Sequence, residues 1–237
     1  MNERASESSK RPAEAERQAT FVLTRFEKWA LPRMAAALPR GVMPDHLTAL
    51  GVLGSTLIAA AYLCTRWSPS WLWVANLGLL LNWFGDSLDG TLARVRKHER
   101  PRYGFYLDHL TDAYSTIAIG LGLGFSPYML VSTGLAIVIA YLTLSINVYL
   151  ETHVFKVFRF GYGIVGPTEA RLLLLCLNVV ALLVGPLGFG IKGVGFTVFD
   201  VVGGAAALGM LALLVTRASR NLHELGRLEP PGTRRPD

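Results

Sequence analysis

The amino-acid sequence predicts an all-α integral membrane protein with six transmembrane helices, preceded by an amphipathic helix at the membrane surface. Of the 237 residues, 51% are hydrophobic and only 17% are charged, whereas soluble domains average about 25% charged residues. Apolar stretches of about 20 residues, the length that a membrane-spanning helix needs, fill most of the chain. The two cysteines, Cys64 and Cys176, lie inside such stretches. This composition excludes disordered, fibrous and disulfide-rich secreted proteins.

The first ordered element that we expect is an amphipathic helix within residues 18–40. Val22, Phe26 and Trp29 recur at i, i+4 and i+7, while the basic residues occupy other faces. This pattern is typical of a helix that lies flat on a membrane, and Pro32 predicts a break or kink in it. A helix that only packs on the protein is the alternative.

Residues 41–217 are expected to form one membrane domain of six spans. These lie near residues 46–65, 70–95, 104–125, 127–152, 168–187 and 195–216. The second and third spans are unusual because acidic residues interrupt them on the same side. Asp86 and Asp89 lie in the last turns of the second span, and Asp108 and Asp112 lie in the first turns of the third.

The basic residues predict the orientation in the membrane. With the N-terminus in the cytoplasm, all but two of the 23 Lys and Arg residues fall on the cytoplasmic side, as the positive-inside rule requires. Arg66 and Lys192 are the two exceptions. The polar segment 1–17, which we expect to be disordered, and the polar tail 218–237 are then both cytoplasmic. Since topology explains these charges, no nucleic-acid partner is expected.

The four aspartates are the strongest functional signal. Asp86 and Asp89 share one helix face, as do Asp108 and Asp112, because their spacings are i, i+3 and i, i+4. The two spans are antiparallel, so all four carboxylates can converge just inside the cytoplasmic boundary. Ionised groups at this depth are costly and repel one another, and such oxygen ligands suit two magnesium or manganese ions. Separate helix caps and surface ion pairs are the alternative.

Residues next to these acids are suited to a phosphorylated ligand. Gly90 and Ala93 allow close approach to the helix backbone, and Arg94 carries a fork of donors for phosphate. The whole pattern resembles the signature of the CDP-alcohol phosphotransferases, whose eight fixed positions are all present here. It runs Asp86-x-x-Asp89-Gly90-x-x-Ala93-Arg94, then nine residues where the family commonly has eight, then Gly104-x-x-x-Asp108-x-x-x-Asp112.

The resemblance implies transfer of a substituted phosphate from a CDP-linked alcohol to an acceptor alcohol, with release of CMP. By this similarity, Asp86, Asp89 and Asp108 would bind one metal ion, and Asp86, Asp108 and Asp112 the other. Asp112 would also remove the proton of the acceptor hydroxyl. The similarity further implies a homodimer.

The remaining signature residues are expected at the substrate. Gly90, Ala93, Arg94 and Gly104 match the part of the signature that faces the cytidine diphosphate. A second element, residues 44–48, resembles the family's Pro-Asn-x-x-Thr element, which borders the nucleotide. By this likeness Asp45, which replaces the usual Asn, and Thr48 are expected at the substrate as well.

The identity of the two alcohols stays open. CDP-diacylglycerol is the working donor, because a short chain with a cytoplasmic N-terminus fits enzymes of the bacterial inner membrane. Residues 107–112, Phe160-Gly161 and Thr168-Glu169 instead resemble the choline and ethanolamine phosphotransferases, which use a soluble CDP-alcohol and a diacylglycerol acceptor. An ion-coupled transporter and a metal-dependent phosphohydrolase are alternatives outside this reaction. Glu151 and His153 have no assigned role, and Glu169 is a candidate for contacting substrate or a neighbouring subunit.

Overall fold

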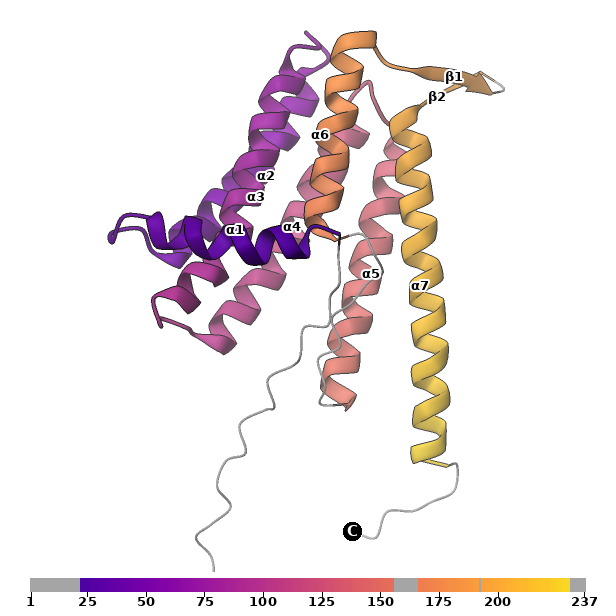
Figure 1. Cartoon of the computed structure of the whole chain (residues 1–237). Coiled ribbons are helices and arrows are strands. Elements are labelled where there is room, and N and C mark those ends of the chain that lie inside the picture. Colours follow the sequence, from indigo (N-terminus) through magenta and orange to yellow (C-terminus); the bar gives the residue numbers. More distant parts are fainter. Residues whose placement is uncertain (1–21, 156–165, 192, 231–237) are drawn as a thin grey trace, which may run out of the picture.

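The computed structural model describes residues 22–155, 166–191 and 193–230, which form seven helices and one two-stranded hairpin. The elements are α1 (Thr24–Ala37), α2 (Pro44–Cys64), α3 (Trp71–Val95), α4 (Pro101–Gly124), α5 (Val131–Phe155), α6 (Pro167–Val184), β1 (Gly188–Ile191), β2 (Val194–Thr197) and α7 (Val198–Leu228). Helices α2 to α7 run along the long axis of the molecule, and α1 lies across the bundle (Figure 1). The predictions made for residues 1–17 and for Phe160-Gly161 lie outside the described residues.

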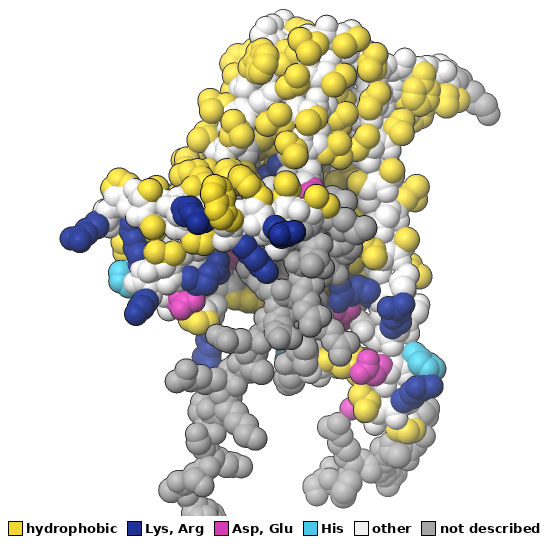
Figure 2. Space-filling view, in the orientation of Figure 1, with side chains coloured by type: hydrophobic (Ala, Val, Ile, Leu, Met, Phe, Trp, Pro, Cys, Tyr) yellow, Lys and Arg dark blue, Asp and Glu magenta, His cyan; other side chains and the backbone are white. Residues whose placement is uncertain are grey.

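The described part of the chain is mostly helical and has the character of a membrane protein. Helices α2, α5, α6 and α7 are long and apolar enough to cross a membrane. Helices α3 and α4, whose lower turns carry the aspartates, do not meet the same measure. The upper part of the visible face is almost entirely hydrophobic, whereas Lys and Arg side chains gather around α1 and below it (Figure 2). The membrane class is confirmed, and the count of six spans stays a prediction.

Helix α1 has the exposed apolar face that its sequence predicts. Val22, Phe26 and Trp29 are all more than half exposed, while Ala35 is buried against residues of α2 and α3. The helix continues through Pro32, so of the expected break or kink, the break is not found. The interfacial position of this helix stays a prediction, with which its exposed apolar side chains agree.

Arg96, immediately after α3, fixes the segment between α1 and α2. Its guanidinium donates to the carbonyl oxygens of Leu38 at 3.1 Å, Pro39 at 2.8 Å and Arg40 at 3.3 Å, and also to that of Val42. Carbonyl groups beyond a helix C-terminus carry partial negative charge, which a cation stabilises. The end of α1, the start of α2 and the lower end of α3 are therefore joined at one residue.

Helices α2 and α3 form the most extensive helix contact in the bundle. A Cβ atom added to Gly54 would lie 2.6 Å from the backbone nitrogen of Asn82, and one added to Gly85 would lie 2.4 Å from that of Gly51. No side chain fits at such separations, so glycine allows the two backbones to touch, as in closely packed membrane helices. This contact holds the aspartates of α3 against α2.

The all-α class is confirmed, but the sequence did not predict the short hairpin of β1 and β2 between α6 and α7. Its strands are antiparallel, with Phe189 opposite Phe196, and the two rings stack with 5.8 Å between their centroids. Glycines alternate here with Phe, Ile and Val, which favour extended backbone. Such four-residue strands are too short to stand out in a chain dominated by 20-residue apolar stretches.

Helix α7 begins directly after the hairpin and is longer than the sequence predicts. The Thr197 side chain caps its first turn, and the Asp200 carboxylate accepts from the backbone nitrogens of Thr197 at 2.9 Å and Leu130 at 2.8 Å. These bonds join the start of α7 to the start of α5. At its other end α7 continues through residues 218–228, which belong to the expected polar tail.

Candidate functional site

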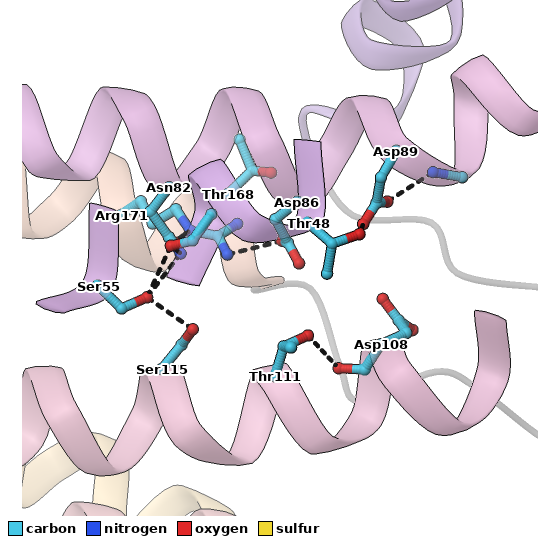
Figure 3. Close-up of polar contacts among 12 residues, drawn as sticks. Thr48, Ser55, Asn82, Asp86, Asp89, Asp108, Thr111, Ser115, Thr168 and Arg171 are labelled. Atoms are coloured by element: carbon cyan, nitrogen blue, oxygen red, sulfur yellow. Dashed lines mark hydrogen bonds and ion pairs between the residues drawn. The ribbon is translucent and has the colours of Figure 1, made fainter. Parts of the chain in front are cut away.

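Asp86 and Asp89 on α3 lie across from Asp108 on α4 (Figure 3), and Asp112 follows Asp108 by one turn of α4. The Asp112 carboxyl group experiences the negative charges of Asp86, Asp108 and Asp89 and the positive charge of Arg171. Each of these groups is partly buried, so their charges are screened less than charges in water. The structure therefore brings the four carboxylates together between two consecutive helices, near their lower ends.

Asp89 is oriented by a residue of α2. The Thr48 hydroxyl donates to Oδ2 of Asp89 at 2.7 Å, and the backbone nitrogen of Gly90 donates to Oδ1 at 2.5 Å. Thr48 is buried and sits one turn into α2, after the helix start at Pro44. The structure thus places Thr48 in the carboxylate cluster through its contact with Asp89.

Asp86 is oriented by a residue of α6. Nη2 of Arg171 lies 2.7 Å from Oδ2 of Asp86, and Nε of the same guanidinium donates to Oδ1 of Asn82 at 2.7 Å. Both contacts appear in Figure 3, where Arg171 lies between Asn82 and Asp86. Arg171 therefore supplies a positive charge directly beside the cluster.

A buried network of hydrogen bonds extends from Asn82 away from the aspartates. Nδ2 of Asn82 donates to the Gly51 carbonyl oxygen and to the Ser55 hydroxyl, both at 2.9 Å. The Ser55 hydroxyl in turn lies 2.6 Å from the hydroxyl of Ser115 on α4. This network joins α2, α3 and α4 at the inner end of the site.

Asn82 and Arg171 are functional candidates that the sequence analysis missed. Asn82 precedes Asp86 by four residues and so lies on the same helix face. Arg171 lies within an expected span, where an ionised residue normally has a specific role, but its charge was attributed to topology. Both signals were present in the sequence.

The residues expected at the nucleotide lie at the exposed ends of α3 and α4. Among the described residues, a Cβ atom on Gly90 would meet only the Arg94 guanidinium, at 3.6 Å, and Ala93 is half-buried on the next turn. Arg94 is exposed and donates to the Thr91 hydroxyl at 3.0 Å. Gly104, in the first turn of α4, has no atom of the described part of the chain within 4 Å of the place that a Cβ would take. Space for a ligand is therefore present at these positions.

Asp45 forms an ion pair with another residue of this protein. Its carboxylate pairs with Arg100, whose guanidinium also lies 3.9 Å from the ring centroid of Tyr103. The hydrogen bond that Arg100 donates to the Asp45 carboxylate raises the pKa of Arg100 above its usual value. Asp45 thus ties the start of α2 to the start of α4, a contact that the neutral Asn of the family's element would make without charge.

The family of the chain follows from a comparison that covers this whole site. A family model for CDP-alcohol phosphatidyltransferases matches residues 41–216. The chain belongs to this family. It is also 35% identical over 92 residues to the phosphatidylinositol phosphate synthase of Cutibacterium acnes (strain DSM 16379 / KPA171202). That stretch covers 38% of this chain and 42% of the relative, so less than half of the relative's length is matched.

The donor set of this CDP-alcohol phosphatidyltransferase family member fits divalent cations in its chemistry and charge. Carboxylate oxygens are the ligands that magnesium and manganese prefer, and four negative charges face the positive charge of Arg171. Among the described residues, however, no three His, Cys, Asp or Glu side chains converge closely enough to hold one ion as they stand. Asp86 and Asp89 are turned toward Arg171 and Thr48. Metal ligation by the aspartates therefore stays a prediction.

Glu151 and Glu169 both have structural contacts in this protein. Oε1 and Oε2 of Glu169 accept from the backbone nitrogens of Leu23 at 2.8 Å and Gly166 at 3.0 Å, which joins the start of α1 to the start of α6. Glu151 is buried on α5, and its Oε2 accepts from Nη2 of Arg217 on α7 at 2.7 Å. The contacts of both acids therefore join one helix to another.

Proposed function

We propose that this protein transfers a substituted phosphate from a CDP-linked alcohol to an acceptor alcohol, with release of CMP, in phospholipid synthesis. The observation that carries the proposal is the grouping of the four signature aspartates between facing helices, in a chain that matches the family over residues 41–216. In this reaction the acceptor oxygen forms a bond to the phosphorus of the transferred group. The bond from that phosphorus to the CMP oxygen breaks, and the acceptor proton must be removed.

Asp112 is our assignment for the group that accepts this proton. It lies on α4 among the other three carboxylates, where a hydroxyl group held between α3 and α4 would be within reach. A carboxylate is a weak base on its own, but correct placement of the acceptor supplies much of the rate. Asp112 then holds the proton while CMP departs.

The four clustered aspartates are assigned as ligands of two divalent cations, magnesium or manganese. When bound, such a pair would polarise the pyrophosphate and offset the negative charge that develops on CMP. Arg94, with its fork of donors at the exposed end of α3, is suited to a phosphate of the CDP group. Gly90 leaves room for that group beside the helix backbone.

A lipidic substrate is supported by an apolar groove of about 270 Å³ beside the cluster. Its walls include Phe26 of α1, Leu79 and Trp83 of α3, and Leu172 of α6, and Arg171 also lines it. Arg171 also contacts Asp86, so one side chain separates this groove from the carboxylates. A fatty acyl chain suits such walls, while a water-soluble nucleotide would approach from the exposed ends of α3 and α4.

We further propose that α2 to α7 all span a bacterial inner membrane, with both termini in the cytoplasm and the protein a homodimer. The gathering of Lys and Arg around α1 and below it supports that end as the cytoplasmic one (Figure 2). The aspartates then lie near the level of the surface helix. At that depth a soluble head group and a lipid tail can both be accommodated.

CDP-diacylglycerol is the proposed donor, with a polar alcohol as acceptor. The relative in Cutibacterium acnes is named a phosphatidylinositol phosphate synthase, and a phosphatidyl group is what CDP-diacylglycerol would supply. The alternative is a soluble CDP-alcohol with a diacylglycerol acceptor, for which the groove would hold the acceptor instead. Membership in a family of CDP-alcohol phosphotransferases argues against ion-coupled transport.

The test is to offer the purified full-length protein, with manganese, three donors in turn: CDP-diacylglycerol, CDP-choline and CDP-ethanolamine. CMP release is followed with and without inositol phosphate or diacylglycerol, and Asp112→Asn serves as the inactive control. Release from CDP-diacylglycerol that depends on a polar acceptor is the expected result. Release from CDP-choline with diacylglycerol would favour the alternative branch, and release without any acceptor would favour a phosphohydrolase.

A further inference from the structure

We propose that Arg171 is a positioning residue for Asp86, and that the buried amide of Asn82 sets the position of Arg171. This inference rests on the proposed function, because it concerns how one of the assigned metal ligands is held. It is carried by the contacts of three residues from α3 and α6, which are separate in the sequence and adjacent in the structure.

The orientation of the Asn82 amide is determined by its surroundings. Its Nδ2 group is a donor, and it faces two acceptors, the carbonyl oxygen of Gly51 and the hydroxyl of Ser55, both at 2.9 Å. Its Oδ1 atom is an acceptor, and it faces the Nε donor of Arg171 at 2.7 Å. A flipped amide would oppose donor to donor at Arg171. Asn82 is 1% exposed, so bulk water does not compete for these bonds.

The guanidinium transfers this fixed orientation to Asp86. Its Nε and Nη2 atoms belong to one rigid plane, so a guanidinium held at Nε by Asn82 presents Nη2 in a defined direction. Nη2 lies 2.7 Å from Oδ2 of Asp86. A lysine at position 171 would keep the charge, but a single ammonium on a flexible stem cannot reproduce this planar fork.

The contact engages only one oxygen of Asp86. Arg171 binds Oδ2, and within the described residues no hydrogen bond to Oδ1 is found. In Figure 3 the Asp86 side chain extends from α3 toward the helix that carries Asp108. A carboxylate held at one oxygen and open at the other is the arrangement in which an outer partner orients a metal ligand. Asp89 differs in this respect, because Thr48 binds its Oδ2 and the backbone nitrogen of Gly90 binds its Oδ1.

Two roles for Arg171 predict opposite results. If Arg171 acted only through its charge, its removal would leave the site more negative, and cation binding would tighten. If it positions Asp86, its replacement will weaken cation binding, by about 10- to 100-fold for a partner of this kind. Replacement by lysine separates the two roles most clearly, because the charge stays and the fork is lost.

The experiment measures Mn²⁺ binding to purified full-length protein without substrate, by the electron paramagnetic resonance signal of free Mn²⁺. We expect Arg171→Lys and Arg171→Gln both to raise the Kd for Mn²⁺ about 10-fold or more, and Asn82→Ala to act in the same direction. Arg217→Lys is the matched control, since Arg217 pairs with Glu151 at the same 2.7 Å on α7. It should leave the Kd unchanged.

Folding and activity are checked on the same samples. Thermal melting in EDTA identifies any variant that fails to fold. If the Arg171 variants fail to fold, the Kd of Asn82→Ala, which leaves Arg171 in place, decides the inference. An unchanged Kd in folded Arg171→Lys, or tighter binding in Arg171→Gln, would overturn the inference. If the wild type releases CMP and binds Mn²⁺, either of those results refutes the positioning role alone. If the wild type does neither, the proposed function itself fails, and this inference with it.

Discussion

The contact between α2 and α3 predicts that Gly85→Ala will damage both stability and catalysis. A Cβ atom at position 85 would lie 2.4 Å from the backbone nitrogen of Gly51 and 2.4 Å from the carbonyl oxygen of Leu47. Both neighbours are backbone atoms of α2, so no side-chain rotation can relieve the clash. Ordinary carbon contacts lie at about 3.5 Å or more, so the two helices must separate by about 1 Å.

The separation of the two helices should change both the melting temperature and the rate of CMP release. Overpacking of a well-packed interior typically costs about 1–3 kcal/mol, so we expect the variant to melt several degrees lower than the wild type. The same displacement would stretch the 2.7 Å bond between Thr48 and Asp89, which crosses the same pair of helices. A misplacement of about 1 Å at reacting groups can cost about 100-fold in rate. We therefore expect CMP release to fall by about that factor.

The assay compares melting in detergent and CMP release for Gly85→Ala and a matched control. Gly204→Ala makes the same chemical change in the interior of α7, where no atom of residues 22–155, 166–191 and 193–230 lies within 4 Å of the added carbon. Alanine favours a helix over glycine by about 0.5–1 kcal/mol, so this control should melt at the wild-type temperature or above it. A Gly85→Ala variant as stable and as active as Gly204→Ala would refute the packing argument.

Three further predictions concern the site. Asp112→Asn should lower CMP release by about 100-fold or more, because the proton acceptor is lost, while Mn²⁺ binding measured by calorimetry largely remains. EDTA should abolish CMP release, and added Mn²⁺ or Mg²⁺ should restore it. Asp45→Asn breaks the exposed pair with Arg100; it should leave the melting temperature unchanged and lower the KM for the CDP donor, because a carboxylate that repels the pyrophosphate is gone.

Each of these has a contradicting result. Full turnover by Asp112→Asn would remove the assignment of the base. Undiminished CMP release after exhaustive EDTA treatment would exclude the role given to divalent cations. If the change in KM for Asp45→Asn persists in 1 M salt, its cause is not electrostatic repulsion, because such ionic strength screens exposed charges within about 3 Å.

The parts of the site that lie close in the sequence could be predicted from it. Helical spacing places Asp86 with Asp89, and Asp108 with Asp112, and a short connection makes the two helices antiparallel. The expected spans at 46–65, 70–95 and 104–125 agree with α2, α3 and α4 to within a few residues. These results depend only on helix periodicity and on the length of apolar stretches.

The parts that depend on distant contacts could not be predicted in the same way. Arg171 and Asp86 are 85 residues apart, and no rule of spacing connects α6 with α3. Glu169 illustrates the same limit, since its bond to Leu23 spans 146 residues and serves helix docking. The hairpin of β1 and β2 was not predicted because its strands are short.

The attachment of Arg96 has a consequence for the way this protein sits in membranes of different thickness. Arg96 binds the carbonyl groups that follow α1, and it stands two residues after Arg94, at the end of the helix that carries Asp86 and Asp89. In the proposed orientation, a bilayer that thins or swells would displace the outer ends of the helices, but α1 would stay with the head groups of its own leaflet. We expect the carboxylates to move with α1. The site would then keep a constant depth below the membrane surface on which α1 lies, whatever the distance to the opposite surface.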